Sequence, residues 1–261
     1  MTDQFHFNDG AAYERQMGVW SRLAGDIFLD WLAPRPGMRW VDVGCGNGAF
    51  TQLIVDRCAP SEVQGFDPSK EQIAFARERP AARLAQFHLG DAMALPFSEP
   101  SFDAAIMALV IFFVPEPAVG VAEMARVVVP GGTVAAYAWD VFNGGLPAEP
   151  ILVELTAMGQ QPIRPPRPEA SRMENLRKLW ADAGLERLET REIVVQRSFA
   201  DFEDFWATSL LSPLLSARLA GMSAGDVERL KNAVAGRLLP EADGRILCSG
   251  RANAIKGYRP S

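Results

Sequence analysis

The fold of this chain is decided by the stretch Trp40-Val41-Asp42-Val43-Gly44-Cys45-Gly46-Asn47-Gly48-Ala49-Phe50. Short apolar residues run into three glycines at alternate positions, and an amphipathic segment follows. Because glycine lacks a Cβ, the backbone can adopt positive φ there and a ligand can come close to the main chain. The start of the next helix offers free N–H groups and the positive end of its dipole. The stretch therefore predicts a buried strand, a tight turn and a helix N-terminus that bind a nucleotide.

Outward from this turn, strands and helices alternate as far as residue 140. The further predicted strands are Glu62–Asp67, Leu84–Leu89, Phe102–Val110 and Thr133–Trp139, and the predicted helices between them are 51–59, 68–83 and 118–129. The third of these strands is strongly apolar, which is typical of a central strand buried on both faces. This alternation predicts a parallel α/β sheet with right-handed crossovers.

The two ends of the chain have a different pattern. Apolar residues recur three and four apart over 11–32, which predicts an N-terminal helix. After residue 140 we expect helices over 149–158, 172–183, 201–220 and 226–239, and strands within 185–199 and 246–255. We expect one domain with an N-terminal helix over the site (11–35), a cofactor-binding core (38–140) and a C-terminal part (141–261). The helices at about 200–240 are inserted before the last strand and are a candidate lid.

Composition limits the class of protein. The chain has 261 residues, 48% of them hydrophobic, and a net charge of −6, which argues against a nucleic-acid partner bound through a basic face. No apolar run approaches the roughly 20 residues of a membrane span. Cys45, Cys58 and Cys248 have no spacing that indicates a disulfide framework or a metal site. We expect a cytoplasmic protein, monomeric or homodimeric, without a bound metal.

Three aspartates help to identify the nucleotide. The glycine turn alone fits the dinucleotide pattern of dehydrogenases, the acid-x-Gly-x-Gly-x-Gly pattern of methyltransferases, or a turn with no ligand. Asp42, two residues before the first glycine, is unusual in a dehydrogenase. Asp67 ends the second strand, where an acid can accept both ribose hydroxyls of either cofactor. Asp91 ends the third strand, where an acid can accept the amino group of adenine, and this favours the methyltransferase pattern.

Over roughly residues 13–140 the chain resembles class I S-adenosylmethionine-dependent methyltransferases of the small-molecule type, related to quinone-biosynthesis methyltransferases. The matching motifs are Val41–Gly48, Gly65–Ser69, Gly90–Phe97, Ser101–Asp103 and Glu123–Gly132. The resemblance implies a Rossmann-like sheet of seven strands, mostly parallel, with helices on both faces and an antiparallel last strand. It also implies S-adenosylmethionine as cofactor and S-adenosyl-L-homocysteine as product. The last two strands would come from Leu185–Ile255.

The same resemblance implies the residues that hold the cofactor. They are Tyr13, Asp42, Gly44, Cys45, Gly46, Gly48, Asp67, Pro68, Asp91, Ala92, Ala108 and Leu109. The glycines would wrap the methionine part, and the Ala108 carbonyl would meet the methionine ammonium. Tyr13 would approach the cofactor's carboxylate, with Trp20 as a weaker candidate for the same wall. Ordinary helix packing is an equal alternative for both aromatic residues.

The chemistry of the acceptor is less constrained. Where related sequences commonly carry histidine after the fourth strand, this chain has Phe112 and Phe113, and its two histidines are His6 and His88. The catalytic residue is unknown. Weak candidates for a base are Asp140, Tyr137 and Asp201, and Asp140 is also a plausible turn-capping acid.

Aromatic side chains indicate an apolar acceptor pocket. The candidates for its lining are Trp20, Phe112, Phe113, Trp139, Phe205 and Trp206, with Phe142 and Phe202 beside them. The alternative is that half of them belong to the core. We expect methyl transfer to a small hydrophobic or aromatic molecule by in-line displacement. The other hypotheses are a non-catalytic S-adenosylmethionine-binding protein and an NAD(P)-dependent oxidoreductase.

Overall fold

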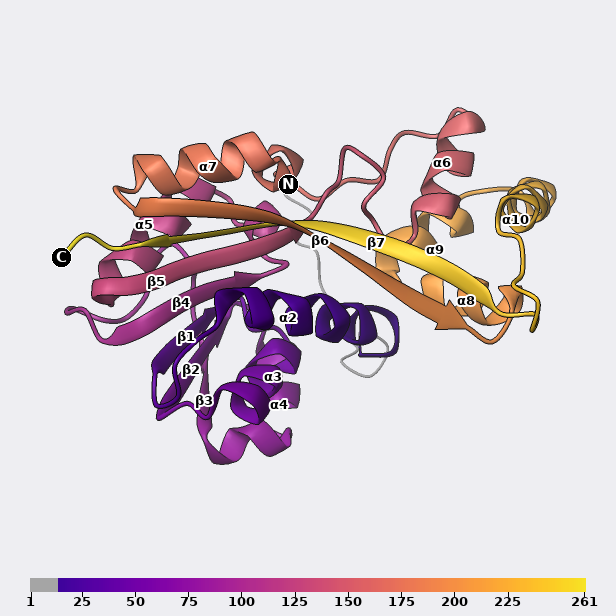
Figure 1. Ribbon diagram of the computed structural model, residues 1–261. Coiled ribbons are helices and arrows are strands. Elements are labelled where there is room, and N and C mark those ends of the chain that lie inside the picture. Colours follow the sequence, from indigo (N-terminus) through magenta and orange to yellow (C-terminus); the bar gives the residue numbers. More distant parts are fainter. Residues whose placement is uncertain (1–13) are drawn as a thin grey trace.

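Strands β1 and β4 lie side by side in the middle of a twisted seven-stranded sheet, whose order is β3-β2-β1-β4-β5-β7-β6 (Figure 1). The computed structural model describes residues 14–261. The strands are β1 (Arg39–Val43), β2 (Glu62–Asp67), β3 (Ala85–Leu89), β4 (Phe102–Ala108), β5 (Val128–Trp139), β6 (Glu186–Phe199) and β7 (Ile246–Tyr258). Strands β1 to β5 pair in parallel, and β7 is antiparallel to both β5 and β6. The predicted mostly parallel sheet with an antiparallel last strand is confirmed.

Helices cover both faces of this sheet. On one face lie α2 (Val19–Leu32), α3 (Ala49–Cys58) and α4 (Lys70–Ala76), and on the other α5 (Pro117–Val127) and α7 (Met173–Asp182) (Figure 1). A π-helical turn, η1 (Glu14–Gly18), precedes α2, and three short 3₁₀ turns are η2 (Pro80–Arg83), η3 (Ile111–Phe113) and η4 (Pro168–Ser171). Within residues 14–261, every helix is too short or too polar to cross a bilayer.

The core is formed where these helices meet the sheet. Phe28 of α2 packs on the fully buried Tyr137 of β5, with ring centroids 4.8 Å apart. On the opposite face, the indole Nε1 of Trp180 in α7 donates to the Val134 carbonyl at 2.9 Å. Both faces of β5 are therefore covered, which explains why its second half reads as a continuous apolar run.

The β6–β7 hairpin extends past the sheet and carries a second group of helices. Pairing of β7 with β5 ends at Trp139↔Ala252, whereas its pairing with β6 continues to Phe199↔Ile246. At the far end lie α8 (Phe202–Ser209), α9 (Pro213–Ala220) and α10 (Ala224–Arg237), together with α6 (Glu149–Ala157) (Figure 1). Arg237 Nε donates to Glu154 Oε1 at 2.8 Å and joins α10 to α6. We call these four helices the helical lobe.

Several boundaries differ from the prediction, and the helix expected over 68–83 is a shorter helix, α4, followed by the 3₁₀ turn η2. The single helix expected over 201–220 is two helices, because Pro213 begins α9 and cannot donate a backbone hydrogen bond. Strand β5 begins at Val128 rather than Thr133. The Pro130–Gly132 segment continues the strand instead of forming a separate turn, since Gly131 N–H donates to the Arg259 carbonyl at 2.9 Å.

Candidate functional site

The carboxyl ends of β1, β2, β3 and β4 meet at one edge of the sheet because these strands are parallel. The glycine turn that follows β1 is fixed to the end of β2. Both Gly44 N–H and Cys45 N–H donate to the Phe66 carbonyl, at 2.7 and 2.9 Å. Gly44, Gly46 and Gly48 all have positive φ, at +78°, +52° and +79°. The turn therefore has the conformation for which glycine was expected.

Two of these glycines meet different surroundings. A Cβ on Gly44 would lie 2.4 Å from Val110 Cγ1, so the turn packs tightly against the segment that follows β4. A Cβ on Gly46 would meet nothing within 4 Å. The backbone at Gly46 therefore faces open space, as a main-chain cradle for a ligand requires.

Asp67, at the end of β2, is bonded to this turn. Its Oδ2 accepts from Gly46 N–H and its Oδ1 from Ser69 N–H, both at 2.9 Å. Burial raises the pKa of the Asp67 carboxyl, and the two N–H groups oppose that rise. Each carboxylate oxygen keeps a further lone pair with which it can accept a ligand hydroxyl.

The end of β3 lies beside the end of β2. Gly90 N–H donates to the Asp67 carbonyl at 3.1 Å, and the next residue, Asp91, is exposed. Asp91 Oδ1 accepts from Met93 N–H at 2.9 Å, which holds its carboxylate in a local turn. The predicted cofactor residues Pro68 and Ala92 lie at the same two strand ends. The acids at the ends of the second and third strands are thus adjacent.

Asp42 is fully buried between β1 and α3. Thr51 Oγ1 donates to its Oδ2 at 2.6 Å, while its Oδ1 has no partner among residues 14–261. Burial raises the pKa of Asp42 to about 7; the Thr51 hydrogen bond opposes the rise and the charge of Asp67 adds to it. An incompletely satisfied acid therefore lies directly next to the glycine turn.

The end of β4 is strained. Leu109 has φ +62°, a left-handed conformation that a branched non-glycine side chain rarely adopts. Its N–H donates to the Tyr137 carbonyl of β5 at 2.8 Å, which fixes the turn that follows Ala108. Such strain persists where the surrounding structure enforces it, and it concentrates at ligand sites.

The start of η1 lies against the glycine turn. Glu14 Oε2 accepts from the side-chain amide of Asn47 at 3.1 Å and also from Arg79 Nη2. Arg79 Nε donates to the Asn47 carbonyl at 2.5 Å. This cluster brings the N-terminal segment to the predicted cofactor site. The cofactor candidate Tyr13 and the histidine His6 lie outside the described residues.

An apolar cavity of about 160 Å³ opens at the same edge, between the sheet and the helical lobe. Four of the six predicted pocket residues line it, namely Trp20, Phe112, Phe113 and Trp139. Trp20 and Trp139 meet edge to face, with ring centroids 6.4 Å apart. Leu109 also lines the cavity. The cavity and the predicted cofactor residues therefore share a wall.

The other two predicted pocket residues, Phe205 and Trp206, do not line the cavity. Phe205 is fully buried and packs edge to face on Phe199, with ring centroids 5.3 Å apart. Trp206 stacks on Phe202, with ring centroids 6.1 Å apart. Phe199 itself lines the cavity. The two residues of α8 therefore form a layer behind the cavity wall.

Sequence reasoning missed most of the lining. The missed residues are Gln16, Met17, Leu146, Pro147, Ala148, Leu152, Ile163, Arg164, Pro165, Phe199, Thr208, Ser209, Ser212, Leu214 and Leu215. They come from η1, from α6 and its flanking loops, from the end of β6, and from α8, α9 and the turn between them. Apolar periodicity predicted the helices but gave no signal that α6 joins the lobe.

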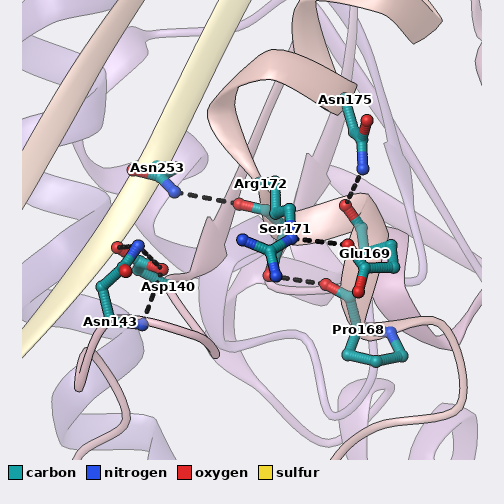
Figure 2. A network of polar contacts seen from close by, with 8 residues as sticks. All are labelled: Asp140, Asn143, Pro168, Glu169, Ser171, Arg172, Asn175 and Asn253. Atoms are coloured by element: carbon teal, nitrogen blue, oxygen red, sulfur yellow. Dashed lines mark hydrogen bonds and ion pairs between the residues drawn. The ribbon is translucent and has the colours of Figure 1, made fainter.

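None of the three candidate bases lines this cavity. Asp140 is buried, and its carboxylate accepts from the Asn143 side-chain amide at 3.1 and 3.0 Å (Figure 2) and from Arg251 Nη2 at 3.0 Å. The Tyr137 hydroxyl donates to the Ser21 carbonyl at 3.4 Å, and Asp201 caps α8 by accepting from Asp204 N–H. These contacts give each side chain a structural role.

His88 lies on β3, at the edge of the sheet. Its Nε2 lies 2.6 Å from Gln64 Oε1, and its ring stacks on Phe66. Burial and the charge of Arg77 lower the pKa of His88. It does not line the cavity, and among residues 14–261 the lining contains no aspartate, glutamate or histidine.

Known proteins similar to this chain include methyltransferases. A family model described as a methyltransferase domain matches residues 41–136. The ubiquinone/menaquinone biosynthesis C-methyltransferase of Cereibacter sphaeroides is 36% identical over 115 residues, which are 42% of this chain and 46% of that protein. The chain thus matches about half the length of this relative.

Solved structures with the same fold cover nearly the whole chain. Phosphoethanolamine N-methyltransferase 2 of Haemonchus contortus, in complex with phosphomonomethylethanolamine and S-adenosylhomocysteine, is 18% identical with a TM-score of 0.59. The match covers 96% of this chain and 56% of that one. The [4+2]-cyclase SpnF is 21% identical with a TM-score of 0.53, over 92% and 81% of the two chains. The predicted class I methyltransferase fold is confirmed.

Proposed function

We propose that this chain, with its methyltransferase domain at residues 41–136, transfers a methyl group from S-adenosylmethionine to a small hydrophobic or aromatic molecule. The observation that carries the proposal is the position of Leu109. This residue directly follows the last residue of β4, beside the predicted cofactor residues, and also lines the apolar cavity. Cofactor and acceptor would therefore meet at the carboxyl edge of the sheet, where α/β proteins bind their ligands.

The residues of the turn suit S-adenosylmethionine. The open space at Gly46 leaves room for the methionine part against the backbone. The carboxylate of Asp67 keeps lone pairs for the ribose hydroxyls, and the exposed Asp91 is available to the adenine amino group. A cationic group held at the turn would also stabilise the ionised form of Asp42, whose Oδ1 has no partner in the described part of the chain.

The protein would promote methyl transfer mainly by positioning the cofactor and the acceptor relative to each other. The bound cofactor supplies a methyl group on a sulfonium, which is an excellent leaving group. Alignment of two reactants is worth effective molarities of ~10⁵–10⁸ M. Trp20, Phe113 and Trp139 would hold the acceptor and keep water away from it. Helices α8 and α9 of the helical lobe, which line the cavity and belong to the lid predicted at about 200–240, would act as that lid.

A protein base is not needed for every acceptor. No acid or histidine lines the cavity within residues 14–261. The acceptor would therefore enter as a nucleophile that is already deprotonated, or release its proton to water. Asp140 and Tyr137 stay weak candidates because their polar atoms are engaged elsewhere.

The composition of the chain bears on its partners, its location and its oligomeric state. A net charge of −6 favours small-molecule partners over nucleic acids. We propose a cytoplasmic enzyme that is a monomer or a homodimer. Gel filtration with light scattering determines the oligomeric state, and a shift of the protein peak on addition of tRNA would contradict the expected lack of nucleic-acid binding.

A second candidate is a protein on this fold that binds the cofactor without methylating anything. It is favoured by the lack of an acid or histidine in the described cavity wall. It is also consistent with the [4+2]-cyclase SpnF, whose name gives a different reaction on the same fold. Any methylated product in a metabolite screen with labelled cofactor would exclude it. The oxidoreductase hypothesis finds no support in the comparisons.

Calorimetry with S-adenosylhomocysteine tests the proposal. Asp67→Ala should weaken binding by at least about 100-fold, because hydrogen bonds to a charged group contribute roughly 1.5–3 kcal/mol each. Asp67→Asn keeps the size of the side chain and should lose nearly as much. Asp182→Ala, an exposed acid on α7, is the matched control and should bind like the unmodified protein. Folded protein that gives no heat with S-adenosylhomocysteine would contradict the proposal.

A further inference from the structure

The wall of the acceptor cavity carries a single charged side chain among residues 14–261, and it is a cation. Arg164 lines the cavity from the loop that precedes η4. The chain as a whole has 32 acidic and 26 basic residues, yet no acidic residue shares this wall. Apart from the two tryptophans, the other lining residues with polar side chains are Gln16, Thr208, Ser209 and Ser212. The charge of this cavity is therefore opposite in sign to that of the protein.

Arg164 has no anionic partner of its own. Its guanidinium carbon lies 4.8 Å from the ring centroid of Phe142, and no carboxylate in the described part of the chain forms an ion pair with it. A second arginine gives a comparison at the same ring. Arg172 lies 3.6 Å from the Phe142 centroid, but its Nε donates to Glu169 Oε2 at 2.5 Å and it does not line the cavity. Of the two stacked arginines, the one without a carboxylate is the one at the cavity.

The loop around Arg164 is held on both sides. Arg218 Nη1 of α9 donates to the Gln161 carbonyl at 2.7 Å. Arg167 N–H donates to the Phe112 carbonyl at 3.0 Å, and Phe112 lines the same cavity. Stacking on Phe142 further restricts the guanidinium. A cation restricted in this way loses little freedom when it binds a ligand.

The exposure of Arg164 places it where the cavity meets solvent. The residue is exposed, whereas Trp20, Phe112 and Trp139 in the same wall are buried. A ligand whose apolar body fills the cavity would therefore present its opposite end to Arg164. Guanidinium groups bind carboxylates through two parallel hydrogen bonds, which makes a carboxylate the best match in shape and charge.

We propose that the acceptor is a small aromatic acid whose carboxylate is bound by Arg164 while its ring lies in the cavity. This inference rests on the proposed function, since it names the class of acceptor for the same site. The cavity of about 160 Å³ suits a single ring, as a cavity of about 150 Å³ holds benzene. Arg164 is a specificity residue in this proposal and takes no part in methyl transfer.

Two probes of equal size test the proposal with the full chain. At neutral pH 4-hydroxybenzoate is charged and 4-hydroxybenzamide is neutral, and the affinity of each is measured by calorimetry or ligand-observed NMR. The carboxylate should bind about tenfold more tightly, the effect of about 1.4 kcal/mol. Arg164→Met should remove this preference and leave amide binding unchanged, and Arg164→Lys should retain part of it. Arg172→Met, which removes the stacked arginine that is already paired, should keep the full preference.

The outcomes separate this proposal from the proposed function. Equal affinity for the two probes, no binding of either, or an equal loss in Arg164→Met and Arg172→Met would overturn the carboxylate site. S-adenosylhomocysteine is titrated into the same variants and should bind to all of them. If it binds to none, the methyltransferase proposal fails, while the probe comparison still decides whether Arg164 binds a carboxylate.

Discussion

The glycine turn and the acceptor cavity lie at the same edge of the sheet but are built in different ways. The turn is made by the main chain of a few consecutive residues, with three glycines at positive φ. The cavity is made by side chains from segments that extend from Gln16 to Leu215. A ligand site formed by the backbone can therefore be predicted from a short sequence motif. A site formed by side chains depends on how distant elements pack together.

The two regions also differ in what stabilises them. At the turn, stability depends on backbone conformation and on the protonation state of the buried Asp42. In the cavity wall, it depends on apolar packing, for example of Trp20 against Trp139. Substitutions chosen from this difference should affect cofactor binding, acceptor binding and stability separately.

The largest effect is expected at Gly44. Gly44→Ala forces a Cβ to within 2.4 Å of Val110 Cγ1 at a backbone φ of +78°. The left-handed conformation costs roughly 1–2 kcal/mol, and overpacking adds about 1–3 kcal/mol. We expect a loss of S-adenosylhomocysteine binding below detection, together with a fall of several kcal/mol in the free energy of unfolding, measured by urea denaturation.

Two other glycines provide the controls for Gly44. Gly37 has φ +80° with nothing within 4 Å of its Cβ position, and it lies in the loop before β1. Gly37→Ala should show the cost of the backbone conformation alone and leave binding intact. Gly46→Ala should lose binding with a similarly small loss of stability, because its Cβ would enter the open space of the cradle. Normal binding by Gly46→Ala would contradict the assignment of that space to the cofactor.

The features that the sequence predicted belong mostly to the glycine turn, and those that it missed belong mostly to the cavity. The parallel pairing of the first strands, the positive φ of the glycines and the positions of Asp67 and Asp91 followed from local spacing and from the rule that parallel strands end at one edge. Phe205 had the same aromatic character as Phe113, yet it lies behind the wall. Aromatic residues suit a core and a pocket equally well, so only the packing of the helical lobe distinguishes them.

Phe205 and Phe113 test this distinction with the next largest effect. Phe205→Ala should lower the free energy of unfolding by about 3–5 kcal/mol, because the side chain is fully buried. Affinity per folded molecule for an aromatic probe should change little. Phe113→Ala, at a half-buried residue of the wall, should cost less stability but weaken the probe several-fold. Denaturation and probe titration of both variants give the comparison, and a larger loss of probe affinity in Phe205→Ala would reverse it.

The smallest effect is a pH dependence expected from the turn and absent from the apolar wall. Asp42 has a pKa of about 7 in the folded protein, because burial disfavours its charge, against an ordinary value of about 4. Between these values the folded state holds a proton that the unfolded state has released. Stability should therefore fall as pH rises from about 4 to about 7 and stay level above that, by roughly 4 kcal/mol at most.

Asp42→Asn separates this contribution from the rest of the pH profile. The amide cannot ionise, and its oxygen can still accept from Thr51 Oγ1, so the fall in stability between about pH 4 and pH 7 should become shallower. Some slope should persist, because burial also raises the pKa of Asp67. Phe113→Ala, which changes the cavity wall, should keep the slope of the unmodified protein. Urea denaturation across this range measures all three proteins, and parallel profiles for Asp42→Asn and the unmodified chain would show that Asp42 is already ionised in the folded state.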